Sequence, residues 1–123
     1  PGRVVDADPG SVEVVTDLLT QRKVPHVTGR TWTTDAIYRE TRGKVERRRA
    51  EGCLTVEMEA AAFLAVAQFR GVPFAQLLYA GDSLAGADWD SRSWTRVHDV
   101  REELFWLAAA AALRLPDLPP GEP

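Results

Sequence analysis

The sequence predicts an α/β fold in which helices cover a sheet that contains parallel strands. Segments with helical spacing of apolar residues alternate along the 123 residues with short apolar segments typical of strands. The connections between the strand-like segments are long enough to cross over a sheet, as parallel strands require. One of these segments, Phe74–Ala80, is apolar apart from Gln76, which is typical of a strand covered on both faces. We therefore expect part of a three-layer α/β/α sandwich with a mixed sheet.

The first predicted helix begins at Asp8-Pro9, because aspartate is a good N-cap and proline suits the first helical position. It should end near Arg22, and its apolar residues recur at helical spacing: Val12, Val15, Leu18 and Leu19. The next segment, Val24–Trp32, is rich in valine, threonine and tryptophan, so we expect a strand interrupted by Pro25 and Gly29. A loop with one helical turn is expected over Thr33–Gly43.

Three further helices and two further strands are predicted in the rest of the chain. Lys44–Glu51 is a charged helix that Gly52 ends, and Cys53–Val56 is a short apolar strand. An alanine-rich helix, Met58–Arg70, follows and is closed by Gly71. Its small side chains would allow close packing on the sheet: Ala60, Ala61, Ala62 and Ala65. After the strand Phe74–Ala80 come a polar loop, Gly81–Trp94, and the last helix, Arg96–Leu113.

The organisation expected is one domain over residues 1–115 with a proline-rich tail over 116–123, which we expect to be disordered. Cys53–Val56 and Phe74–Ala80 should be adjacent central strands, with helices Met58–Arg70 and Arg96–Leu113 packed on the sheet. A doubly wound sheet normally has five or more strands, and only about three are visible here. The sequence therefore predicts part of a larger domain.

Composition excludes several classes of function. Apolar residues make up 45% of the chain and charged residues 27%, as in globular proteins. A net charge of −3 disfavours nucleic-acid binding, and no apolar stretch approaches the length of a membrane span. With one cysteine and two histidines, neither a disulfide nor a cysteine- or histidine-based metal centre is expected. No signal peptide is visible, so we expect a cytoplasmic protein.

Two acidic clusters follow predicted strands, where open α/β sheets bind their ligands. Glu57 and Glu59 flank Met58 at the junction of a strand and a helix, so both could face one pocket. The alternative is that these glutamates only stabilise the N-terminus of the helix. The second cluster, Gly81-Asp82-Ser83, comes directly after Phe74–Ala80. Asp82 could act as an acid if its pKa is raised, and an apolar strand with nearby glutamates would raise it.

These motifs resemble the nucleoside phosphorylase family, which includes hexameric purine nucleoside phosphorylases, uridine phosphorylases and methylthioadenosine/adenosylhomocysteine nucleosidases. The resemblance runs from about Gly29 to Leu113. It consists of three motifs in order: Thr34-Asp35-Ala36-Ile37-Tyr38, Val56-Glu57-Met58-Glu59-Ala60-Ala61 and Gly81-Asp82-Ser83. The Glu-Met-Glu segment is the most specific of them.

The resemblance implies a role for each matching residue. Glu59 would bind the ribose 2′- and 3′-hydroxyls and Met58 would lie against the sugar, while Glu57 and the backbone around Val56 would line the nucleoside pocket. Asp82 matches the aspartate that protonates the purine N7. A phenylalanine usually stacks on the base at the position of Ile37, which keeps the apolar contact and loses the ring.

The resemblance also implies the reaction and its partners. Cleavage of an N-glycosidic bond places positive charge on the sugar and negative charge on the base, which a carboxylate and an acid would stabilise. The expected substrates are a purine nucleoside or uridine with inorganic phosphate, and the expected assembly is a dimer or hexamer. No cofactor, metal, nucleic acid or membrane is expected.

Other readings stay open. Asp82 favours purines, and Tyr38 is followed by Arg39-Glu40-Thr41-Arg42 without the glutamine that uridine-specific members use, although uridine is not excluded. A nucleosidase would use water in place of phosphate. The family's phosphate site comes from a glycine-rich N-terminal loop, and here Gly2 and Gly10 are isolated. The chain is therefore expected to be the C-terminal half of the domain, inactive alone, or a non-catalytic nucleoside-binding or assembly unit.

Overall fold

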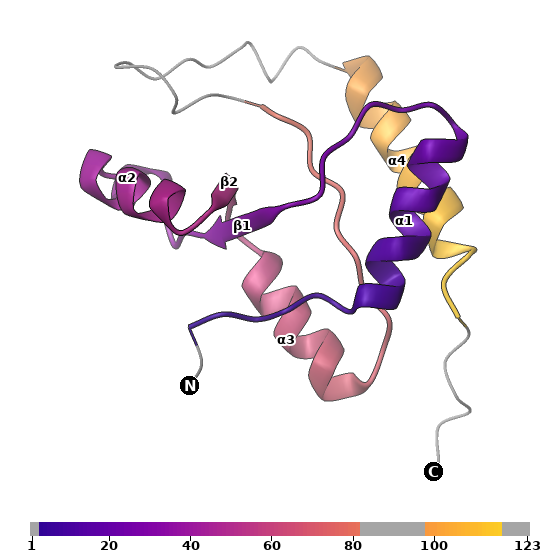
Figure 1. Ribbon diagram of the computed structural model, residues 1–123, viewed down its shortest axis with the longest axis horizontal. Coiled ribbons are helices and arrows are strands. Elements are labelled where there is room, and N and C mark those ends of the chain that lie inside the picture. The colour runs from indigo at the N-terminus through magenta and orange to yellow at the C-terminus, as the bar shows by residue number, and fades with distance from the viewer. Residues whose placement is uncertain (1–2, 82–97, 117–123) are drawn as a thin grey trace.

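The computed structural model describes residues 3–81 and 98–116, and its helices and strands alternate along the chain (Figure 1). In this part the elements are, in order, α1 Pro9–Gln21, β1 Arg30–Thr33, the 3₁₀ turn η1 Ile37–Arg39, α2 Arg42–Ala50, β2 Cys53–Glu57, α3 Ala60–Arg70 and α4 His98–Ala112. Four helices and a two-stranded parallel sheet confirm the predicted α/β class. None of the helices in these two ranges has the length and apolar character that a membrane span needs.

Helix α1 begins as the sequence predicts. The Asp8 side chain accepts hydrogen bonds from the Ser11 backbone N–H at 2.8 Å and from the Ser11 hydroxyl at 2.6 Å, and Pro9 is the first helical residue. These hydrogen bonds lower the pKa of Asp8 below its usual value. The cap satisfies a backbone donor that has no partner inside the helix.

The sheet is shorter at its start than predicted. Strand β1 begins at Arg30, not at Val24, and pairs in parallel with β2 so that Trp32 lies opposite Val56 and Thr33 opposite Glu57. The Val24 N–H is used to close α1 on the Leu19 carbonyl at 2.9 Å, and Pro25 has no N–H to offer to a ladder. The segment before Arg30 therefore stays outside the sheet.

Gly29 fits the position where the chain enters β1. A Cβ atom on this residue would lie 2.2 Å from Cδ1 of Leu54 on the neighbouring strand. Because that distance is far below van der Waals contact, any side chain here would push Leu54 away and disturb the start of the ladder. Glycine allows this close approach of the two strands.

The prediction of adjacent central strands over Cys53–Val56 and Phe74–Ala80 is wrong for the described residues. The hydrogen-bonded neighbour of β2 is β1, and residues 72–81 form no strand. Gly71 ends α3 in the left-handed conformation, with φ of 63°, and the segment that follows runs beside α1 (Figure 1). There Ala75 and Leu77 pack against helices, so the apolar pattern is satisfied by packing without a hydrogen-bonded ladder.

The core lies between α1 and α4. It is made by buried Val15, Leu18, Leu19 and Ala111, with Leu107 and Ala110 packed against them. Helix α4 was expected on the sheet, and it covers the apolar face of α1 instead (Figure 1). Alanines on α4 allow the two helices to approach closely, and α1 offers a stripe of larger side chains to be covered.

Helix α3 packs against β1 through fewer alanines than expected. Ala60 and Ala67 are buried, whereas Ala61, Ala62 and Ala65 are exposed. The two buried residues are seven apart and so lie on one face of the helix. Of the four alanines predicted to allow close packing on the sheet, only Ala60 is buried.

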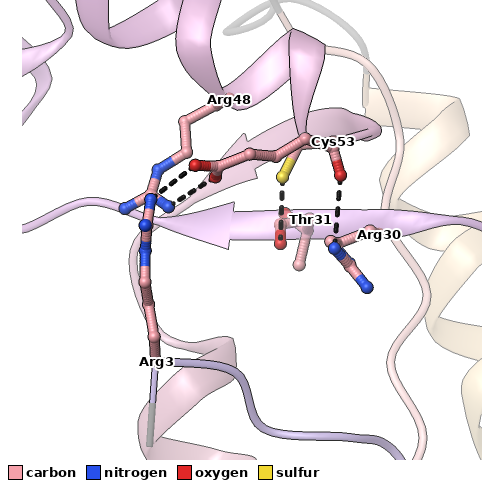
Figure 2. A network of polar contacts seen from close by, with 6 residues as sticks. Arg3, Arg30, Thr31, Arg48 and Cys53 are labelled. Carbon is pink, nitrogen blue, oxygen red and sulfur yellow. Dashed lines mark hydrogen bonds and ion pairs between the residues drawn. The ribbon is translucent and has the colours of Figure 1, made fainter.

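A polar network joins the N-terminal segment to the start of β2 (Figure 2). The Glu51 carboxylate binds Arg48 at 2.8 Å and Arg3 through its second oxygen, while Arg30 donates to the Glu51 carbonyl at 3.2 Å. The hydrogen bond from Arg48 is the main cause that lowers the pKa of Glu51. Arg48 also lies over the ring of buried Trp32, 5.7 Å from its centroid, so α2 is held on the sheet by the same side chain.

Candidate functional site

Four of the six predicted site residues, Val56, Glu57, Met58 and Glu59, lie where β2 turns into α3. Strand β2 ends at Glu57 and α3 begins at Ala60, so only Met58 and Glu59 connect them. Thr33, the last residue of β1, lies opposite Glu57 in the parallel ladder. The chain therefore leaves both strands at the same edge of the sheet, their carboxyl ends, where α/β proteins bind ligands.

The Glu57 carboxylate is fully engaged in building this turn. One of its oxygens accepts hydrogen bonds from the backbone N–H of Glu59, at 2.7 Å, and of Ala60. The other accepts from the Thr33 hydroxyl, whose oxygen in turn accepts the Ala61 N–H at 3.1 Å. The first backbone donors of α3 are thus satisfied by a side chain of each strand. The Glu57 carboxylate therefore stabilises the N-terminus of α3, which was one of the two interpretations of the sequence.

Thr34 links two of the three motifs. Its side chain is buried, and its backbone N–H donates to the Glu57 carbonyl at 2.9 Å, which extends the ladder beyond β1. Its hydroxyl donates to the Ala36 carbonyl at 3.2 Å and so shapes the turn that leads into η1. Ile37, the residue expected against the base, follows on η1 with 72% of its surface exposed.

Met58 and Glu59 project from the turn. Met58 is 45% exposed and Glu59 is exposed, although Glu59 occupies the N-cap position of α3. Its side chain makes no capping hydrogen bond, because Glu57 already serves the amides there. Val56 is half-buried beside them in the ladder. The turn therefore presents one thioether and one carboxylate to solvent at the carboxyl edge of the sheet.

Asp82, the residue expected to protonate the base, lies outside the described residues. The structure therefore brings together Val56, Glu57, Met58 and Glu59 at one edge, with η1 and Ile37 leaving the sheet from that same edge.

Two cavities of the described part lie elsewhere. One, of about 290 Å³, lies between the N-terminal segment and α3 near Asp6 and Gln68. The other, of about 390 Å³, lies between α3, residues 74–79 and α4. Neither is lined by the turn from Val56 to Glu59. These residues also contain no group of acidic, histidine or cysteine side chains arranged to hold a metal ion.

Thr33 and Thr34 are site residues that the sequence analysis missed. Both were assigned to the start of a loop, yet one hydroxyl binds the first turn of α3 and one amide extends the sheet. The available signal was a pair of threonines just after a predicted strand. Its meaning depends on which strand lies alongside, and sequence spacing does not reveal that.

Comparison with known protein families agrees with the motifs. Residues 2–115 match the phosphorylase superfamily. Since this is nearly the whole chain, the protein belongs to that superfamily. A search of curated proteins finds no match.

Proposed function

We propose that this chain belongs to a nucleoside phosphorylase, which exchanges the base of a purine nucleoside or of uridine for phosphate in nucleoside catabolism and salvage. The β2–α3 turn is the observation that supports this most directly. Glu57 is used in holding the turn, and Glu59 is left exposed two residues later at the carboxyl edge of the sheet. Superfamily membership and the order of the three motifs support an assignment to the C-terminal portion of the domain.

Each residue of the turn has a role in the proposal. Glu59 accepts hydrogen bonds from the ribose 2′- and 3′-hydroxyls, and Met58 packs against the sugar. Glu57 acts as a positioning residue, because its carboxylate fixes the backbone that carries Glu59. Ile37 and Val56 supply apolar contacts to the nucleoside.

The proposed chemistry needs an acid at the base. As the glycosidic bond breaks, the sugar gains positive charge, which the Glu59 carboxylate favours. The departing base gains negative charge, and Asp82 donates a proton to it. Phosphate then bonds to the anomeric carbon, so that the products are the protonated base and a ribose phosphate. Phosphate is a co-substrate here, and the proposal includes no cofactor or metal.

The proposed partners are small molecules and further copies of the chain. A nucleoside and phosphate occupy the site, and the protein assembles as a dimer or hexamer. Nucleic acid and membranes are not proposed as partners, in keeping with a net charge of −3.

The role of Glu59 is tested by nucleoside binding. We expect inosine to bind the chain in isothermal titration calorimetry, and Glu59→Gln to weaken binding at least about tenfold, because a charged acceptor for two hydroxyls is lost. Glu46→Gln is the matched control, since Glu46 is an exposed glutamate on α2, away from this turn. Equal affinity for both variants would remove Glu59 from the site.

A second assay separates phosphorolysis from hydrolysis. Base release from inosine, uridine and methylthioadenosine is measured with and without inorganic phosphate in preparations that contain the chain. Release that requires phosphate supports the proposal. Release at the same rate without phosphate contradicts it and identifies a nucleosidase.

A further inference from the structure

The Ala61 backbone N–H is the group to which the Glu59 side chain would ordinarily bind as a helix cap. Glu59 is the N-cap residue of α3, so Ala61 is the second residue of that helix. The side chain of an N-cap residue typically accepts a hydrogen bond from the N–H of the second or third helical residue, and the positive end of the helix favours a carboxylate there. In this structure the Glu59 side chain makes no such bond, and the Ala61 N–H donates to the Thr33 hydroxyl oxygen at 3.1 Å.

The Thr33 hydroxyl is held in one direction. Its single hydrogen is donated to the Glu57 carboxylate, so its oxygen is left to accept the Ala61 N–H. Hydrogen bonds that form such a chain polarise and strengthen one another. The backbone keeps the chain in place, because Thr33 lies opposite Glu57 in the ladder and the Thr34 N–H donates to the Glu57 carbonyl at 2.9 Å. The hydroxyl therefore occupies the Ala61 amide and has no second hydrogen to donate to a ligand.

Without this hydroxyl, the helix would compete with a ligand for Glu59. The Ala61 N–H would lose its acceptor, and an unsatisfied N–H at the start of a helix costs free energy. Glu57 already accepts from the N–H groups of Glu59 and Ala60, so the carboxylate nearest in sequence that is left to take the Ala61 amide is that of Glu59. A Glu59 side chain that caps α3 in this way is withdrawn from solvent and from the hydroxyls of a ribose.

We propose that Thr33 is a positioning residue, which keeps Glu59 available to the nucleoside by occupying the Ala61 amide. The inference rests on the proposed function for the identity of the ligand. The competition for Glu59 can nevertheless be measured with no ligand present, so the two proposals can fail separately.

Thermal unfolding measures this competition in the full chain. In the wild type, Glu59→Ala should leave the melting temperature unchanged, because Glu59 makes no capping hydrogen bond. In a Thr33→Val background the same change should lower the melting temperature by a few degrees, because there Glu59 caps α3. In a Thr33→Ser background, which keeps the hydroxyl, Glu59→Ala should again have no effect.

Titration with inosine measures the consequence for the ligand. Thr33→Val should weaken binding about fivefold, which corresponds to one N-cap hydrogen bond, and Thr33→Ser should bind within about twofold of the wild type. When Glu59→Ala is already present, Thr33→Val should cause no further loss, since Thr33 acts through Glu59. A Thr33→Val variant that binds inosine as tightly as a binding wild type would overturn the inference.

Thr31→Val is the matched control. Thr31 lies two residues earlier on the same face of β1, and its hydroxyl donates to the Thr55 carbonyl at 3.2 Å, away from the turn. This variant should bind inosine like the wild type, and Glu59→Ala should stay without effect in it. The inference also fails if Thr31→Val behaves like Thr33→Val, or if Glu59→Ala changes the melting temperature equally in the wild type and in Thr33→Val. A wild type that does not bind inosine refutes the proposed function instead, and the melting temperatures then still decide whether Thr33 keeps Glu59 off the helix.

Discussion

Glu57 and Glu59, two residues apart, have different roles in this protein. The Glu57 carboxylate binds two backbone amides at the start of α3 and the Thr33 hydroxyl, whereas Glu59 is exposed and makes no capping hydrogen bond. The first fixes the turn, and the second is free to meet a ligand. Stability and binding can therefore be separated by mutation within one turn.

Glu57→Ala should destabilise the protein and Glu59→Ala should not. Removing the Glu57 carboxylate leaves two N-terminal amides of α3 and the Thr33 hydroxyl without their acceptor, so we expect the free energy of unfolding to fall by about 1–2 kcal/mol. Urea denaturation followed by circular dichroism measures this. If Glu59→Ala costs as much as Glu57→Ala, the division of roles between the two residues is incorrect.

The sequence predicts where this turn lies but not that its two carboxylates have different roles. The position of the turn is predicted because a strand-like segment is followed directly by an alanine-rich helix. The different roles of the two glutamates depend on the Thr33 hydroxyl. This hydroxyl reaches Glu57 only because β1 and β2 pair in parallel with Thr33 and Glu57 opposite one another. A contact between residues 24 positions apart leaves no local pattern in the sequence.

Among the elements, α1 shows how a local signal leads to a correct prediction. Asp8, Pro9 and the apolar spacing that follows all specify the same helix, and the cap forms as expected. Phe74–Ala80 shows the opposite case. Its apolar composition indicates packed side chains, as found for Ala75 and Leu77, but a strand also needs a hydrogen-bonded neighbour, and composition does not supply one.

The cap makes the stability of α1 dependent on pH. Hydrogen bonds from Ser11 lower the pKa of Asp8 below its usual value of about 3.9, so the stabilisation is complete above that pH and is lost as the pH falls through the lowered pKa. Asp8→Ala should therefore lower the melting temperature at pH 7, with the difference from the wild type narrowing below about pH 4.

Asp17→Ala is the matched control, since Asp17 is an exposed aspartate on the same helix. It should leave the melting temperature nearly unchanged over the same pH range. A gap between Asp8→Ala and the wild type that stays constant from pH 7 to pH 2 would show that the carboxylate charge of Asp8 is not what stabilises the helix.

At the scale of the whole molecule, stability depends on a small core. Val15, Leu18 and Leu19 on α1 meet Ala111 on α4, and many other large apolar side chains of the described part are exposed, such as Phe69 and Leu113. Helix α1 is thus buried mainly by an element near the other end of the chain. The loss of one core side chain should remove a large share of the total stability.

Leu18→Ala tests this dependence. Leu18 is fully buried, and truncation of a buried leucine to alanine typically costs about 2–5 kcal/mol, against a total of about 5–15 kcal/mol for an ordinary domain. We expect this variant to lose a cooperative thermal transition, as followed by circular dichroism. Leu113→Ala, at a position that is 90% exposed, should melt like the wild type. Cooperative melting of Leu18→Ala near the wild-type temperature would show that the α1–α4 contact is not the centre of stability.

The contact between α1 and α4 also has a consequence for synthesis on the ribosome. Helix α4 contributes Ala111 to the core that α1 builds, with Leu107 and Ala110 packed against it, and the Arg114 side chain reaches back to Gln21 across 93 positions. At a translation rate of roughly 5–20 residues per second, the apolar face of α1 therefore emerges several seconds before this part of its cover exists. During that interval the nascent chain presents an uncovered amphipathic helix, which is the kind of surface that chaperones at the tunnel exit bind.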